Sequence, residues 1–166
     1  MKNLRPNLCI FLDMDGVLWT KSWSEMAYKF EVKCNMELDP RAVALFERLL
    51  KLLGCKVVMV STWKHGCSVI EINKELNEKG CNFRIDDKTE DLIDRPREIT
   101  DFCKKHNIED YIIIDDESYD NEHSENIVQT FCNTGFTIHE FKEVLNKVGV
   151  FKDARTKFRE SKNNKK

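Results

Sequence analysis

The sequence predicts an α/β fold: a single domain with a mostly parallel sheet flanked by helices. Short apolar runs alternate with amphipathic segments of helical length, which is typical of βαβ units. The chain has 166 residues, of which 41% are hydrophobic and 34% are charged, as in an ordinary globular protein of one domain. We expect this domain to occupy residues 1–150 and a basic tail to follow over residues 151–166.

The first strand is predicted at residues 8–12, an apolar run that ends in two aspartates one residue apart. Gly16 follows and lets the chain turn sharply. The carboxylates of Asp13 and Asp15 repel each other and are costly to desolvate, so together they favour a hard cation. One could attack phosphorus while the other moves a proton. The alternative is a strand that simply ends in an acidic turn.

The next elements are predicted from their boundary residues. Residues 19–38 are polar and aromatic without clean periodicity, so no regular element is predicted there. Asp39 and Pro40 open a helix as N-cap and first helical residue, and Gly54 ends it. A second apolar run begins at Lys56 and predicts the second strand.

The middle of the chain predicts one helix, one strand and one loop. Ser68 and Glu71 form a capping box for a helix that runs through Glu78. A short strand is expected at residues 83–85. Residues 86–94 are expected to be a loop whose charges face solvent.

The C-terminal third repeats the same alternation. A helix is expected at about residues 97–105, and the apolar run that starts at Tyr111 predicts a third major strand. A last strand is expected at residues 127–130. Thr137 and Glu140 form a second capping box, which starts the final helix.

Polar side chains follow the three major strands where each of them ends. In open parallel sheets, ligands bind outside the carboxyl ends of the strands. The sequence therefore predicts one site at one edge of the sheet, built from Asp13, Asp15, Ser61, Asp115 and Asp116.

These strand ends resemble, in order, motifs of the haloacid dehalogenase (HAD) superfamily of magnesium-dependent phosphatases and phosphotransferases. Residues 13–17 (DMDGV) resemble motif one, Ser61 motif two, and Asp115-Asp116 with Asp120 motif four. More narrowly, three segments are similar to HAD domains of nucleic-acid repair proteins, such as the phosphatase domains of polynucleotide kinase-phosphatases. These segments are residues 61–64 (STWK), 95–99 (RPREI) and 128–137.

The resemblance implies a Rossmann-like HAD domain with no large cap and with residues 19–38 as at most a small flap, because the gaps between motifs are filled by the expected elements. It also implies that Asp13 attacks phosphorus to form an aspartyl-phosphate, while Asp15 acts as general acid and base. Ser61 would hold a phosphoryl oxygen. Mg²⁺ would be bound by Asp13, by the backbone carbonyl of Asp15, and by Asp115 or Asp116.

Two assignments within the resemblance stay open. HAD proteins usually carry a lysine in motif three, and here either Arg95 or Arg97 would supply that charge. Thr62, Trp63 and Lys64 follow the motif-two hydroxyl and are expected at the site mouth as substrate-binding residues. There Trp63 would either stack on a base or pack against the next helix.

Composition narrows the remaining questions. The seven cysteines are scattered and never form a CxxC pair, which favours reduced thiols and a cytoplasmic location. No apolar stretch approaches about 20 residues, so we expect no membrane span. The net charge of −2 excludes no partner, and the basic residues 151–166 could contact nucleic acid or form a solvated tail.

The favoured function is a magnesium-dependent phosphatase acting on a nucleic-acid or nucleotide phosphate end. The alternatives are a small-metabolite or protein phosphatase of the same superfamily, or a binding module that keeps the fold but has weak turnover.

Overall fold

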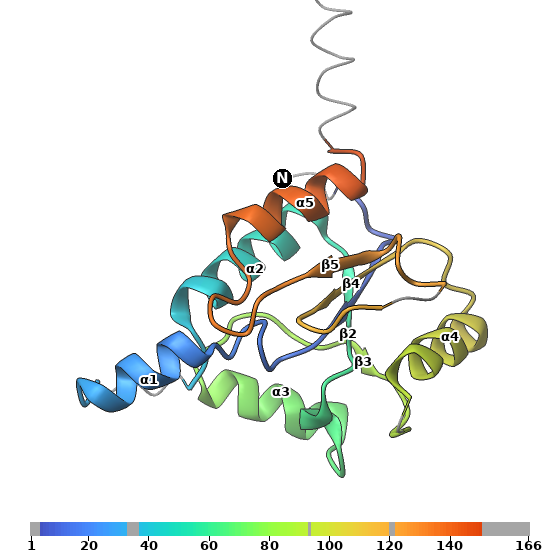
Figure 1. The fold of residues 1–166 in the computed structure, drawn as a ribbon. Coiled ribbons are helices and arrows are strands. Elements are labelled where there is room, and N and C mark those ends of the chain that lie inside the picture. Colours follow the sequence, from blue (N-terminus) through green and yellow to red (C-terminus); the bar gives the residue numbers. More distant parts are fainter. Residues whose placement is uncertain (1–3, 33–36, 93, 120–121, 151–166) are drawn as a thin grey trace, which may run out of the picture.

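A five-stranded, wholly parallel sheet organises the computed structural model, which describes residues 4–32, 37–92, 94–119 and 122–150 (Figure 1). The strands are β1 (Cys9–Leu12), β2 (Lys56–Met59), β3 (Asp87–Lys88), β4 (Tyr111–Asp115) and β5 (Ile127–Gln129). Their order across the sheet is β3-β2-β1-β4-β5. This confirms the predicted α/β fold with a mostly parallel sheet.

β1 is the central strand and is buried on both faces. Phe11 lies opposite Val58 of β2 and Ile113 of β4. Each residue of β1 has an exposed fraction of 3% or less. A parallel strand covered on both faces needs an unbroken apolar sequence, which residues 8–12 supply. Asp13 directly follows this strand, so it lies at the carboxyl end of the central strand of the sheet.

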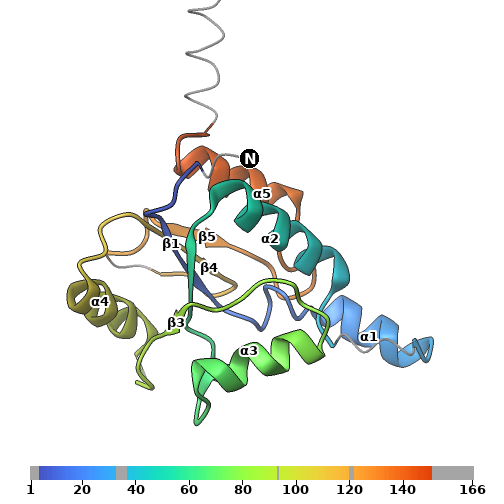
Figure 2. The same ribbon diagram turned by 180° about the vertical axis from the view of Figure 1, so that it is seen from behind.

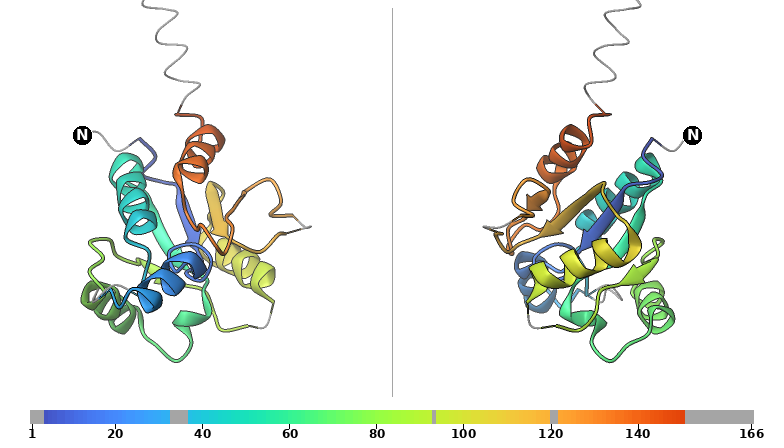
Figure 3. Two further views of the ribbon diagram at one scale, coloured as in Figure 1. Left: turned by 60° about the vertical axis from the view of Figure 1, so that its left-hand side comes forward. Right: turned by 90° about the vertical axis from the view of Figure 1, so that its right-hand side faces the viewer.

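Helices cover the two faces unequally (Figures 1 and 3). The helices are α1 (Lys21–Lys29), α2 (Pro40–Leu53), α3 (Val69–Glu78), α4 (Arg95–His106) and α5 (Ile138–Lys147), with a short 3₁₀ helix η1 (Thr62–Lys64). One apolar cluster joins α2, α3 and α5 to the sheet face that carries Ile10 and Leu12. The other cluster joins α4 to the opposite face, which carries Cys9 and Phe11.

The predicted boundaries of three helices are confirmed. The Asp39 side chain accepts a hydrogen bond from the Arg41 N–H at the start of α2, and Gly54 ends that helix with φ 67°. Both capping boxes form, at Ser68 for α3 and at Thr137 for α5. These signals lie within one turn of the helix end, so local sequence is enough to find them.

The segment after the first site turn contains a helix that the sequence did not predict. Thr20 caps α1 and its side chain accepts a hydrogen bond from the Trp23 N–H. None of the residues of α1 itself is buried. It projects from the body of the molecule (Figure 2). Between β1 and β2 the described residues contain only the helices α1 and α2, so no large cap is inserted there.

The strand expected at residues 83–85 is wrong. Phe83 and Ile85 are buried as in a strand, but the backbone groups of Ile85 and Asn82 form hydrogen bonds with side chains and not with a neighbouring strand. The Asn73 side chain bonds both the N–H and the carbonyl of Ile85, and the Glu47 carboxylate accepts from the Asn82 N–H. Pairing with β2 begins only at β3, inside the stretch expected to be a solvated loop.

The remaining expectations concern the later part of the chain. α4 begins at Arg95, two residues before its predicted start, because Asp94 caps it. None of the helices in the described part of the chain has both the length and the apolar character needed to cross a membrane. The basic tail at residues 151–166 and the motif residue Asp120 lie outside the described residues.

Candidate active site

The ends of three strands and the start of one helix converge at the carboxyl edge of the sheet. Asp13 follows β1, Ser61 follows β2 and caps η1, and Asp115 ends β4. Arg95 is the first residue of α4. All three residues at the strand ends are buried, with exposed fractions of 3% or less. The structure therefore brings together side chains that are up to 102 positions apart in the sequence.

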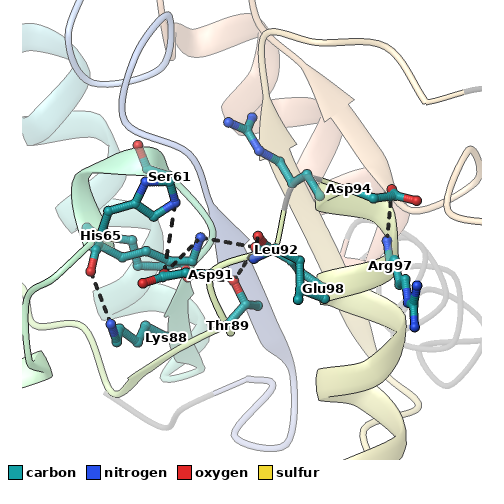
Figure 4. Close-up of polar contacts among 12 residues, drawn as sticks. Ser61, His65, Lys88, Thr89, Asp91, Leu92, Asp94, Arg97 and Glu98 are labelled. Atoms are coloured by element: carbon teal, nitrogen blue, oxygen red, sulfur yellow. Dashed lines mark hydrogen bonds and ion pairs between the residues drawn. The ribbon is translucent and has the colours of Figure 1, made fainter.

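Arg95 bridges the two buried carboxylates. Its Nη1 donates to Asp13 Oδ2 at 3.0 Å and to Asp115 Oδ2 at 2.7 Å. Burial alone would lower the pKa of Arg95, but Asp13 and Asp115 raise it above its usual value. Arg97 instead faces solvent, with a side chain that is 72% exposed and pairs with Asp101. Figure 4 shows the Arg97 backbone beside Asp94, whose carboxylate accepts its N–H. Of the two candidate arginines, only Arg95 reaches the site.

The negative charge of Asp13 is only partly offset by its hydrogen-bond donors and by Arg95. Its Oδ1 accepts from the Met14 N–H at 2.8 Å, and the Ser61 side chain also hydrogen-bonds it. Burial and the neighbouring Asp115 nevertheless raise the pKa of Asp13 from 3.8 to about 6, against the opposing effect of Arg95. The arrangement thus favours an additional positive charge near this carboxylate.

Both carboxylate oxygens of Asp115 accept hydrogen bonds. In addition to Arg95, the Tyr119 hydroxyl donates to its Oδ2 at 2.8 Å and the Glu117 N–H donates to its Oδ1 at 2.9 Å. Burial, and then Asp115, raises the pKa of Tyr119, which keeps the hydroxyl protonated. Sequence reasoning missed Tyr119, and its position four residues after Asp115 in an otherwise acidic turn was the only signal.

Asp116 lies directly against the backbone of Gly16. A Cβ atom added to Gly16, which has φ 69°, would come within 2.3 Å of Asp116 Cγ. Burial and Asp115 raise the pKa of Asp116. No hydrogen-bond donor from another described residue reaches its carboxylate, so its oxygens are open to a ligand.

These three carboxylates could hold a metal ion. Asp13, Asp115 and Asp116 each offer an oxygen within 4.8 Å of the other two. Oxygen donors of this kind suit a hard cation, and Arg95 neutralises only part of their charge. The residues present therefore fit a divalent metal, with Asp116 as the carboxylate that has free lone pairs. Asp15 is absent from this cluster, and its backbone carbonyl as a ligand stays a prediction.

Asp15 and Trp63 contact each other at the exposed side of the site. The Trp63 Nε1–H donates to Asp15 Oδ2 at 3.1 Å. The Asp15 side chain is exposed, Trp63 is half-buried and Thr62 is exposed. Trp63 also packs against the main apolar cluster, and both of its predicted alternatives, base stacking and packing against the next helix, stay predictions.

The expected place of Lys64 at the site mouth is wrong. Its side chain is only 1% exposed, and its Nζ lies 3.1 Å from Glu98 Oε2. Glu98 in turn accepts hydrogen bonds from the Thr89 hydroxyl at 2.7 Å and the Leu92 N–H at 2.8 Å (Figure 4). A buried carboxylate on α4 thus draws the ammonium inward, since an unpaired buried charge is costly.

The site thus has an aspartate after β1, a hydroxyl after β2, an arginine on α4 and paired aspartates at the end of β4, the arrangement that the HAD motifs predicted. Residues 9–141 match the family model described as "HAD domain in Swiss Army Knife RNA repair proteins". The chain belongs to this family. A search of curated proteins found no match.

Proposed function

We propose that the chain is a phosphomonoester hydrolase that removes a terminal phosphate from RNA through an aspartyl-phosphate intermediate. One observation carries this proposal: Asp13, Ser61, Arg95 and the Asp115-Asp116 pair converge at a single edge of the sheet. The match to HAD domains of RNA repair proteins supports the choice of substrate class.

In this mechanism Asp13 attacks the phosphorus atom in line, and the bond to the leaving oxygen breaks. Arg95 offsets the charge of the nucleophile and of the transferred group, and the Ser61 hydroxyl holds a phosphoryl oxygen. Asp15 gives its proton to the leaving oxygen. In the second step Asp15 takes a proton from the water that attacks phosphorus, which frees Asp13.

The cofactor in this proposal is Mg²⁺, held by Asp13 and Asp116 with Asp115 beside them. When bound, it would offset the excess negative charge that otherwise repels a phosphate. Both the raised pKa of Asp13 and the open oxygens of Asp116 support this assignment. Asp115 instead holds Arg95 and Tyr119 in place, because both donate hydrogen bonds to its Oδ2.

An RNA end also suits the open side of the site. Within the described residues no large cap stands over Asp15 and Trp63, which leaves room for a long polymer to approach. The family description, which names RNA repair, supports the choice of RNA.

The test is phosphate release from RNA and DNA oligonucleotides that carry a 3′- or a 5′-phosphate, and from an aryl phosphate, with Mg²⁺ or with EDTA. We expect turnover of an RNA end in Mg²⁺ only, and loss of at least 10²-fold in Asp13→Asn, since that change removes the nucleophile. Arg97→Gln serves as a charge control outside the site and should keep full activity.

Other outcomes would replace the proposal. Activity on the aryl ester alone would favour the small-metabolite or protein phosphatase. Silence on every ester, with intact folding, would favour the binding module.

A further inference from the structure

Asp15 stands apart from the other carboxylates of the site, because it is exposed and lies outside the acidic cluster. An exposed aspartate samples several rotamers, and only some of them aim its proton at a bound substrate. In this structure its Oδ2 accepts a hydrogen bond of 3.1 Å from the Trp63 indole N–H. That contact restricts a side chain which would otherwise be free to turn.

Trp63 is itself held in place. It is the middle residue of η1, the short helix that follows the buried Ser61, and it packs against the main apolar cluster. Lys79 caps the C-terminal end of α3, and its Nζ lies 5.6 Å from the centroid of the Trp63 ring. Lys79 is fixed in turn by Glu37 at 2.6 Å and Glu75 at 3.4 Å. The indole N–H is therefore presented in a defined direction.

We propose that Trp63 is a positioning residue that orients Asp15 for proton transfer, an inference that rests on the proposed phosphatase function. An indole N–H can only donate, so Oδ2 must accept and Oδ1 is left to carry the acidic proton. In the first displacement that proton passes to the leaving oxygen as its bond to phosphorus breaks. In the second, Oδ1 takes a proton from water as the water oxygen bonds to phosphorus and Asp13 leaves.

This role differs from a base-stacking platform, the other use of an aromatic ring at a nucleic-acid site. Stacking needs a free ring face. Here the apolar cluster packs against the ring, Lys79 lies near it, and its N–H edge faces Asp15. The contacts of Trp63 are accordingly those of a residue that holds another side chain.

The test compares two leaving groups, because a general acid matters most when the leaving oxygen is strongly basic. The substrates are an aryl phosphate, with a weakly basic leaving group, and the phosphorylated RNA oligonucleotide, whose leaving group is a ribose hydroxyl. The measured quantity is kcat/KM, which reports the first displacement. Trp63→Phe keeps the ring and removes only the N–H.

We expect Trp63→Phe to lower kcat/KM for the oligonucleotide at least tenfold more than for the aryl ester. Asp15→Asn should show the same selectivity more strongly. In the double variant, Trp63→Phe should add no further selective loss, because there is no acid left to orient. Trp23→Phe, on α1, controls for the loss of an indole elsewhere and should keep the wild-type ratio.

An equal loss on both substrates would overturn the inference, since it would indicate a structural role only. So would a wild-type ratio in Trp63→Phe together with a weakened oligonucleotide KM in Trp63→Ala, which would identify a stacking platform. If the wild-type chain turns over neither substrate, the proposed function fails and takes this inference with it.

Discussion

Asp13 illustrates at the scale of one residue how a buried carboxylate weakens the fold that holds it. Its folded pKa of about 6 lies above the usual 3.8. A carboxyl group with a raised pKa costs nothing below the lower value, and its destabilising effect is complete once the pH exceeds the higher one. The rise corresponds to about 3 kcal/mol at neutral pH.

We therefore expect Asp13→Asn to raise the free energy of unfolding at pH 7.5 in EDTA by about 1–3 kcal/mol, because the neutral amide needs less solvation. The gain should shrink as the pH falls from 6 towards 4. Urea unfolding at several pH values measures this. A destabilised Asp13→Asn protein at pH 7.5 would contradict the raised pKa.

Gly16 is the second residue with a sharp requirement. Gly16 and Gly66 have nearly the same backbone angle, φ 69° and 70°, but a Cβ on Gly66 would meet nothing within 4 Å. Gly66→Ala thus measures the backbone strain alone, about 1 kcal/mol. Gly16→Ala adds a collision with the carboxylate of Asp116.

We expect Gly16→Ala to cost at least ~1 kcal/mol more than Gly66→Ala in urea unfolding, because the carboxylate must move or the turn must open. It should also raise the Mg²⁺ concentration needed for phosphate release, which Gly66→Ala should not. Equal effects of the two variants would show that the collision relaxes without consequence.

At the scale of elements, the buried pair of Lys64 and Glu98 joins η1 to α4. Ser61 caps η1 and Arg95 is the first residue of α4, so the ion pair helps to set the spacing of the site. Both side chains are at most 2% exposed, and Glu98 makes further hydrogen bonds to the loop at residues 89–92.

Lys64→Met should therefore destabilise the fold by about 3–5 kcal/mol, because Glu98 is left as an uncompensated buried charge. Adding Glu98→Gln should recover part of that loss. Lys74→Met, in an exposed pair with Glu78, serves as the control and should cost less than about 1 kcal/mol. Thermal unfolding of these variants, of Glu98→Gln alone and of the wild type gives the comparison, and additive losses would argue against a coupled pair.

The elements also show which features the sequence could predict. Helix ends at Asp39, Ser68 and Thr137 were predictable because each cap bonds backbone within three residues. Residues 83–85 were mistaken for a strand because the decisive partner, Asn73, lies on another element. The sequence around residues 83–85 does not indicate hydrogen bonds to a residue on another element.

The same distinction applies to the site. The strand ends that carry Asp13, Ser61 and Asp115 followed from the apolar runs before them. The choice of Arg95 over Arg97 did not, since both lie in the first turn of α4 and only the packing of that helix decides which one points inward.

At the scale of the whole molecule, the parallel sheet concentrates negative charge at one edge. Asp13, Asp115 and Asp116 meet there with Arg95 as their cationic partner. The fold therefore holds a charge imbalance that a bound cation would relieve, and binding to the folded state alone raises stability by mass action.

Mg²⁺ should accordingly raise the melting temperature of the wild-type chain, with a gain of about 2.7 kcal/mol at one hundred times its Kd. Asp116→Asn should abolish this gain, because it removes the carboxylate whose oxygens are open. Glu117→Gln removes a neighbouring charge, 4.0 Å from Arg95 Nη1 on a side chain that is 69% exposed, and should keep most of the gain. If Asp116→Asn is still stabilised by Mg²⁺ as the wild type is, then Asp115 holds the ion, and its bonds to Arg95 and Tyr119 must rearrange when the metal binds.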